Sequence, residues 1–228
     1  MTQCASEREW PGEGIGWKAP ESLETIRVET PRLVIRLYAV EDAAEVFESV
    51  DSCRAYLSEW MDWVAHYERV ENATEYIVKN MIGVRKLAET REIGVGIYDR
   101  ETGKHVGGIG FHGLKLETAA AEFGYWIRKD LAGHGYASEA SQAWLSFMLR
   151  PQAEGGMGMA RVRAYCSGDN PASRRVLEKL GLPLEVVQRQ DYFVKGFGLT
   201  SRIGFGVMHD EWDFTQQRAL STTPASRV

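Results

Sequence analysis

Ala132-Gly133-His134-Gly135-Tyr136-Ala137 is the run of this 228-residue chain that says most about its architecture. It follows an apolar run, 123–127, that is typical of a strand, and it precedes a helix-like run, 138–149. A glycine-rich turn of this kind leaves backbone N–H groups unpartnered at the positive end of a helix dipole. Such a turn binds anions, most often phosphates. Taken alone, the pattern is equally compatible with a tight turn that binds nothing.

The composition is typical of a soluble globular protein, with 44% hydrophobic and 26% charged residues. The net charge of −5 argues against a nucleic-acid partner, because such binders use a broad basic surface. No apolar run reaches the length that crosses a bilayer, so we expect no membrane partner. The first residues lack the basic start and apolar centre of a secretory signal.

Cysteine and histidine are sparse and scattered along the chain. Three cysteines without a spacing pattern indicate a reducing cytoplasm and no disulfide framework. The five histidines show no ligand-like pairing on a helix, so we expect no metal. The predicted location is cytoplasmic, and a monomer and a homodimer are both compatible with the sequence.

Periodicity predicts one mixed α/β domain over 25–213, between an irregular extension (1–24) and a polar tail (214–228). In the extension, Trp10 and Trp17 are expected to dock on the body. Glycines 107, 108 and 110 lie inside a predicted strand and indicate a bulge or a close backbone approach. The expected strands are 26–37, 93–98, 105–112, 119–128, 160–166, 186–194 and 199–208, and the expected helices are 41–50, 53–60, 71–87, 138–149 and 170–181.

Three pieces of the chain, in order, carry a family resemblance. They are 30–43 (TPRLVIRL…EDA), 122–140 (EFGYW…GYASEA) and 167–181, which contains Asn170-Pro171-Ala172-Ser173. Together they resemble the GCN5-related N-acetyltransferase (GNAT) superfamily, and most of all its RimJ/RimL-like branch of ribosomal-protein acetyltransferases. The resemblance spans about 29–212. It implies an α/β fold with a bent, mixed but mostly antiparallel sheet, splayed in the middle and flanked by helices, with acetyl-CoA in the gap.

The resemblance also implies the residues that bind acetyl-CoA. The turn from Ala132 through Gly133, His134, Gly135 and Tyr136 to Ala137 would cradle the pyrophosphate. The family has Gln or Arg at the first position, so Ala132 departs, but the backbone donors remain. The backbone of Ile127 and Arg128 would pair with the pantetheine arm, and the Asn170 amide would contact it. Arg175 or Lys179 would reach the adenosine phosphate, although two cations at the ends of a helix are more often solvated surface residues.

Acetyl transfer to an amine needs a base, a stabilised oxyanion and a protonated leaving thiolate. Glu122, at the start of the strand beside the groove, is the first candidate base; an exposed strand-end acid is the alternative. Asp191 is the second, suggested by the resemblance. Ser173 resembles the family's general acid, and helix capping beside Asn170 is its alternative role. A covalent route through Cys166 is not expected, because it lies in a predicted core strand.

The remaining polar candidates belong to the acceptor side. His112 ends a predicted strand and is able to act as a base near neutral pH, but a hydrogen-bonded loop histidine is the favoured interpretation. His134 is expected to be exposed, with its backbone more important than its ring. The segments 60–67 and 191–200 predict an aromatic-lined, mildly acidic pocket for a cationic amine, with Asp62, Glu68 and Asp191.

The predicted function is therefore an acetyl-CoA-dependent N-acetyltransferase without a metal. Its expected acceptor is a primary amine, and a protein N-terminal α-amine is the favoured one. The amine would attack acetyl-CoA directly in a ternary complex. Two alternatives remain open: acetylation of a small-molecule amine, such as an antibiotic or an aminoacyl compound, and a non-catalytic acyl-CoA-binding module.

Overall fold

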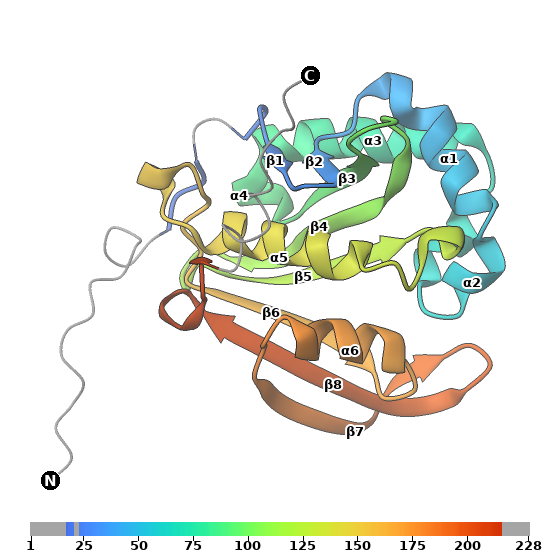
Figure 1. Ribbon diagram of the computed structural model, residues 1–228. Coiled ribbons are helices and arrows are strands. Elements are labelled where there is room, and N and C mark those ends of the chain that lie inside the picture. The colour runs from blue at the N-terminus through green and yellow to red at the C-terminus, as the bar shows by residue number, and fades with distance from the viewer. Residues whose placement is uncertain (1–16, 21–22, 216–228) are drawn as a thin grey trace, which may run out of the picture.

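Eight strands form one sheet in the order β1-β2-β3-β4-β5-β6-β8-β7 (Figure 1). The computed structural model describes residues 17–20 and 23–215, so Trp10 and the end of the predicted tail lie outside it. All neighbouring strands are antiparallel except β5 and β6, which are parallel. The predicted mixed, mostly antiparallel sheet is confirmed. The strands are β1 Arg27–Glu29, β2 Leu33–Arg36, β3 Ile93–Asp99, β4 His105–Lys115, β5 Ala120–Ile127, β6 Arg161–Ser167, β7 Leu184–Val194 and β8 Gly198–Met208.

Helices cover both faces of this sheet. Neighbours along β3 belong to two different cores: Ile97 packs with residues of α5, and Tyr98 packs with residues of α1 and α3. Because successive side chains of a strand point to opposite faces, α5 and the α1–α3 pair lie on opposite sides. The α-helices are α1 Ala43–Asp51, α2 Arg54–Ser58, α3 Val70–Arg85, α4 Leu87–Thr90, α5 Tyr136–Leu149 and α6 Pro171–Lys179, and the 3-10 helices are η1 Val40–Asp42, η2 Asp62–His66, η3 Lys129–Leu131, η4 Gln152–Glu154 and η5 His209–Glu211.

The prediction of one strand over 26–37 is wrong, because the chain reverses in the middle of this segment. Strands β1 and β2 pair antiparallel, with Arg27 opposite Arg36. The hydroxyl of Thr30 accepts a hydrogen bond from Leu33 N at 2.8 Å. Pro31 follows with a fixed φ and no N–H to donate, which favours a turn. The predicted helix 71–87 is likewise divided, and it ends as α3 at Arg85 before the short α4 begins.

The glycines of β4 allow the close approach that the sequence predicts. A Cβ on Gly107 would lie 2.1 Å from the carbonyl oxygen of Trp126, and one on Gly110 would lie 2.2 Å from that of Ile93. Neither backbone neighbour has room to move, so any side chain here would disrupt the sheet. The strand β4 can therefore pack tightly between β3 and β5, at the centre of the molecule.

The sheet is splayed between β5 and β6. These strands pair only from Ala120 to Glu122 and from Arg161 to Arg163, and β5 continues to Ile127 without a partner on that side within the described residues. Figure 1 shows β6, β8 and β7 diverging from the rest of the sheet, with α6 beside them. The expected splay is confirmed, and it exposes the backbone edge of the second half of β5.

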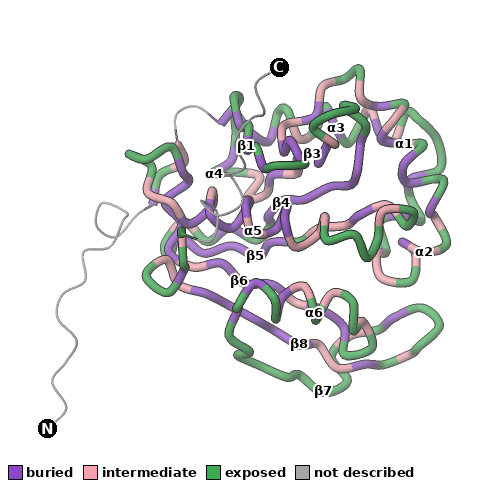
Figure 2. The backbone as a smooth tube through the Cα atoms, viewed as in Figure 1, coloured by how far each residue is buried: buried purple, intermediate pink, exposed green. Residues whose placement is uncertain are grey.

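Burial follows this division. The central strands are buried, whereas β7 at the sheet edge is exposed along most of its length (Figure 2). Trp17 docks as predicted: it is 6% exposed, and its Nε1 donates to Met157 O at 2.8 Å.

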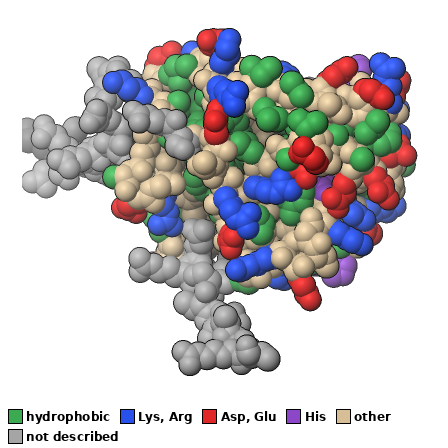
Figure 3. All heavy atoms as spheres, turned by 90° about the horizontal axis from the view of Figure 1, so that it is seen from above, with side chains coloured by type: hydrophobic (Ala, Val, Ile, Leu, Met, Phe, Trp, Pro, Cys, Tyr) green, Lys and Arg blue, Asp and Glu red, His purple; other side chains and the backbone are tan. Residues whose placement is uncertain are grey.

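The face of the molecule that is seen from above carries interspersed acidic and basic side chains (Figure 3). None of the described helices combines the length and the apolar character needed to cross a membrane.

Candidate active site

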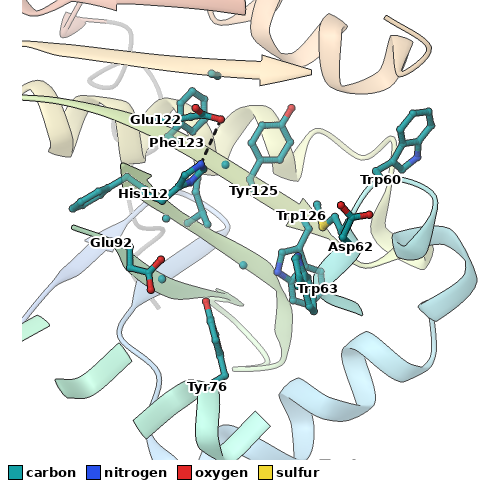
Figure 4. Close-up of a pocket in the computed structure, with 18 of the residues that line it drawn as sticks. Trp60, Asp62, Trp63, Tyr76, Glu92, His112, Glu122, Phe123, Tyr125 and Trp126 are labelled. Atoms are coloured by element: carbon teal, nitrogen blue, oxygen red, sulfur yellow. Dashed lines mark ion pairs between the residues drawn. The ribbon is translucent and has the colours of Figure 1, made fainter. Parts of the chain in front are cut away.

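A cavity of about 910 Å³ runs from the gap between β5 and β6 to the space beneath η2 and α3. Its lining falls into two halves. One half consists of the edge of β5, the end of β6 and the start of α6, including Tyr125, Cys166, Asn170 and Ser173. The other half is aromatic and acidic, and Figure 4 shows its labelled side chains: Trp60, Asp62, Trp63, Tyr76, Glu92, His112, Glu122 and Trp126.

The predicted anion turn has the expected backbone. Gly133 and Gly135 have φ of 84° and 85°, a region that glycine adopts without strain. Gly135 caps α5, which begins at Tyr136, so the first N–H groups of a 14-residue helix lie just after the turn. Apart from its own chain neighbours, no atom of the described residues lies within 4 Å of a Cβ built on Gly133. His134 is exposed, as predicted, and its ring contacts Ala132 O at 3.1 Å. The turn is therefore suited to a pyrophosphate through its backbone.

Ile127 and Arg128 differ in what their backbones offer. The N–H of Arg128 donates to Val106 O at 2.9 Å, and its carbonyl accepts from Leu131 N at 3.1 Å. Because backbone groups alternate sides along an antiparallel strand, Ile127 and Tyr125 face the gap instead. The backbone of Ile127 faces the gap, whereas that of Arg128 is already hydrogen-bonded and its guanidinium pairs with Asp130 at 2.9 Å. The contacts of both residues with the pantetheine arm stay predictions.

Asn170 and Ser173 meet the same end of the gap. The Asn170 Oδ1 accepts from Ser173 N at 2.9 Å, which confirms the cap and leaves the amide nitrogen as a donor in a cavity-lining residue. The Ser173 hydroxyl lies 3.2 Å from the hydroxyl of Tyr125. Burial raises the pKa of Tyr125 well above its ordinary value, so its hydroxyl stays protonated. The sequence analysis did not single out Tyr125 as a site residue. Tyr125 alternates with Phe123 and Ile127 along the strand, and this period-two pattern places it on the same side of the strand as Ile127.

The outer cofactor residues contribute less to the cavity. Arg175 is exposed on α6, its Nε donates to Pro171 O at 3.1 Å, and neither it nor Lys179 lines the cavity. Their contact with the adenosine phosphate stays a prediction. Cys166 does line the cavity, but burial raises the pKa of its thiol to about 11. A protonated thiol is a poor nucleophile, which agrees with the expected absence of a covalent route.

Glu122 lies at the centre of an ionic cluster. Its Oε1 is 3.4 Å from His112 Nε2 and 3.3 Å from an Arg202 guanidinium nitrogen. Burial alone would raise the pKa of Glu122, but His112, Arg202 and Arg163 together bring it below its ordinary value. The carboxyl is therefore ionised and already paired. Arg202 is on β8, and no motif in the sequence pointed to it.

Asp191 is not brought into this cluster. It is exposed on β7, and the cavity is lined instead by its neighbour Tyr192, whose hydroxyl donates to Trp60 O at 3.5 Å. The register of β7 shifts between Gln188 and Tyr192, and Gln190 has φ of 54°. A bulge of this kind changes which side chain faces inward.

The second half of the cavity is aromatic and acidic, as the sequence predicts. The Trp60 ring stacks on Phe197 with centroids 5.5 Å apart, and Trp63 packs edge-on against Tyr67 at the same separation. Asp62 lines the cavity, whereas Glu68 lines a separate surface hollow. Among residues 17–20 and 23–215, no three His, Cys, Asp or Glu side chains are arranged to hold a metal.

Comparison with known proteins now identifies the family. The family described as "Acetyltransferase (GNAT) domain" matches residues 32–183. The chain belongs to the GNAT family of N-acetyltransferases. An uncharacterised N-acetyltransferase of Bacillus subtilis, YoaA, is 32% identical over 173 residues, which cover 74% of this chain and 89% of YoaA.

Two solved structures share the GNAT fold with this chain. One is RimL, a ribosomal L7/L12 α-N-protein acetyltransferase in complex with coenzyme A (TM-score 0.70, 19% identity, 80% of this chain and 98% of that one). The other is the ribosomal-protein-S5-alanine acetyltransferase of Vibrio fischeri (TM-score 0.70, 18% identity, 82% and 99%). The expected family and fold are thus confirmed, and this GNAT chain is an acyltransferase.

Proposed function

We propose that this GNAT enzyme transfers the acetyl group of acetyl-CoA to the α-amine of a protein N-terminus, by direct attack in a ternary complex. The observation that carries the proposal is the continuous cavity, which joins the open edge of β5 to an aromatic, acidic half. The acidic half suits a cationic amine. The two structural neighbours described above, which are named as acetyltransferases of ribosomal proteins, support this acceptor class.

The glycine turn before α5 and Ile127 lie outside the lining of the cavity, and together with the residues of its first half they fit the cofactor. The N-terminus of α5 with its two positive-φ glycines supplies N–H donors for the pyrophosphate, and the free edge of β5 at Ile127 supplies strand-like pairing for the arm. We propose that Asn170 donates its amide N–H to the same arm and that Ser173, backed by Tyr125, protonates the leaving thiolate. We propose that Glu122 takes part in removing the proton of the acceptor amine.

A panel of acceptors tests this proposal through release of the coenzyme A thiol. Peptides with a free N-terminal Ala or Ser are expected to react and to gain the mass of one acetyl group. The same peptides with a blocked N-terminus and one internal lysine are the matched controls and should not react. If only the lysine side chain is acetylated, the assignment of an α-amine is overturned.

The aromatic lining favours a second candidate, a small-molecule amine with a flat ring system. Trp60, Trp63 and Tyr67 offer faces on which such a ring would stack. Aminoacyl compounds and aminated antibiotics in the same panel distinguish the two candidates. We further propose a cytoplasmic location, in keeping with the free, buried Cys53 and Cys166.

A further inference from the structure

His112 and Glu122 face each other across the β4–β5 pair. They are direct cross-strand partners, and His112 Nε2 lies 3.4 Å from Glu122 Oε1 (Figure 4). The two side chains differ in their access to the cavity that both line. The carboxylate is 16% exposed, whereas the imidazole is 56% exposed. An acceptor amine that enters the cavity therefore meets the ring more readily than the carboxylate.

The carboxylate of Glu122 is also engaged from another strand. Arg202 of β8 approaches the same oxygen, Oε1, at 3.3 Å, and Arg163 of β6 adds a further positive charge nearby. To accept a proton, Glu122 would have to give up two ionic partners. Its lowered pKa expresses this cost, and it makes the carboxylate a weak base at neutral pH.

The surroundings of His112 have the opposite effect. The groups that face the ring are Glu122 from β5, Glu92 just before β3 and Arg202 from β8. Glu92 is itself paired with Lys79 of α3 at 2.9 Å. The contact with Glu122 outweighs burial and raises the pKa of His112 above its ordinary value. A general base is most effective when its pKa lies near the operating pH.

We infer that His112 accepts the proton of the acceptor ammonium, and that Glu122 is the positioning residue that orients and polarises the ring. With the Nε2 proton directed at Glu122, Nδ1 is the ring atom that accepts. This inference deepens the proposed function and rests on it in one respect only, that the acceptor is a primary amine.

The proton balance of the transfer is complete with these groups. An N–H bond of the ammonium breaks, its electron pair stays on nitrogen, and the proton moves to Nδ1 and then to solvent. The nitrogen attacks the thioester carbonyl, the C–N bond forms and the C–S bond breaks. The second proton of the attacking nitrogen reaches the departing thiolate by way of the Ser173 hydroxyl. The sum is an amide, a free thiol and one proton released.

The pH dependence of kcat/KM tests the inference with whichever amine the panel identifies. In the wild type, kcat/KM should rise with pH through a single ionisation, which forms the acid limb of the profile. His112→Gln should lower kcat/KM at pH 7 about 100-fold and replace that limb by one set by the ionisation of the acceptor amine itself. Glu122→Gln should keep the limb but move it to lower pH by about one unit, and it should add little to His112→Gln in the double variant. His209→Gln changes a histidine that does not line the cavity and should leave the profile as it is.

Two results would overturn the inference. In the first, Glu122→Gln lowers kcat/KM at least as much as His112→Gln, and the limb persists without His112; Glu122 is then the base itself. The second needs no acceptor. NMR titration of the His112 ring in the free enzyme should give a pKa above about 6.5 that falls in Glu122→Gln. A ring that titrates at or below that value with Glu122 intact refutes the role of His112, even if the acceptor is not a protein N-terminus.

Discussion

At the scale of single residues, His105 places a polar ring in an apolar setting. It is fully buried, and the aromatic rings of Tyr38, Tyr98 and Trp126 lie around it, with centroids 5.3–6.1 Å away. Within the described part of the chain, neither ring nitrogen has a hydrogen-bond partner. Burial lowers the pKa of His105 to about 4, so the ring is neutral in the folded protein at physiological pH.

His105 should make the fold sensitive to acid. Its pKa is depressed on folding, so the unfolded chain binds the extra proton between about pH 6.5 and pH 4, and stability falls as the pH falls through that window. We expect a loss of about 2 kcal/mol between pH 8 and pH 5 from this group. Urea unfolding of the wild type and of His105→Leu at both pH values measures it. An equal pH dependence in the two proteins would contradict the prediction.

The hydroxyl pair of Ser173 and Tyr125 should affect the chemical step more than binding. Ser173→Ala removes the proposed proton donor but keeps the backbone N–H that Asn170 caps. We expect kcat to fall about 10-fold, with little change in the KM for acetyl-CoA. This is less than the roughly 100-fold or more that is typical of general acids, because a thiolate is a good leaving group. Tyr125→Phe should have a smaller effect in the same direction. A rise in KM without a fall in kcat would indicate a binding role instead.

At the scale of elements, the β1–β2 turn holds the start of α5. Glu139, 8% exposed on α5, accepts hydrogen bonds from the Thr30 hydroxyl at 2.6 Å and from the backbone N–H of Arg32 at 3.1 Å. The Arg32 guanidinium bonds Glu139 at 2.7 Å, donates to His134 O at 3.0 Å and stacks over the Tyr136 ring. The position of the glycine turn before α5 is thus fixed from a strand pair about a hundred residues earlier in the chain.

Loss of this contact should weaken cofactor binding selectively. Arg32→Ala frees the turn and leaves the Glu139 carboxylate, a buried anion, without its cation. We expect the Kd for coenzyme A, measured by calorimetry, to rise about 10-fold, while the acceptor KM changes little. Arg27→Ala, which removes an exposed arginine paired with Glu29 of the same strand β1, is the matched control. Equal affinities of the two variants would show that the turn holds its shape without Arg32.

The sequence predicts the elements of this fold better than the pairs of side chains that meet between them. Glycine spacing gives the turn before α5, and Asn170 with Pro171 gives the start of α6. His112 and Glu122 were singled out separately, but their meeting depends on the β4–β5 register, which the irregular connection around Ala119 does not reveal. Arg202 reaches Glu122 from 80 residues away in the chain. The bulge at Gln190, which turns Tyr192 and not Asp191 inward, has no glycine to signal it.

At the scale of the whole molecule, the sheet has its shortest strand pairing beside the proposed site, along with the β1–β2 pair. Three residue pairs join β5 to β6. The half formed by β6, β7, β8 and α6 also shares a core with α5, and side-chain contacts such as Glu122–Arg202 and Tyr125–Ser173 cross the gap. A ligand that bonds to the free edge of β5 and to Asn170 contacts both halves. Cofactor binding and the stability of the splayed region should therefore be coupled.

Coenzyme A should stabilise the protein and protect the splayed edge in particular. At a concentration of 100 times its Kd, a ligand of the folded state adds about 2.7 kcal/mol, which for a chain of this size raises Tm by roughly 5–10 °C. In hydrogen exchange, amides at Tyr125 and Ile127 should slow most, because their N–H groups face the gap, whereas those of the outer edge of β7 should not change. Asn170→Ala should reduce both effects. Uniform protection across the sheet would instead indicate that the ligand stabilises the fold globally without bridging β5 and α6.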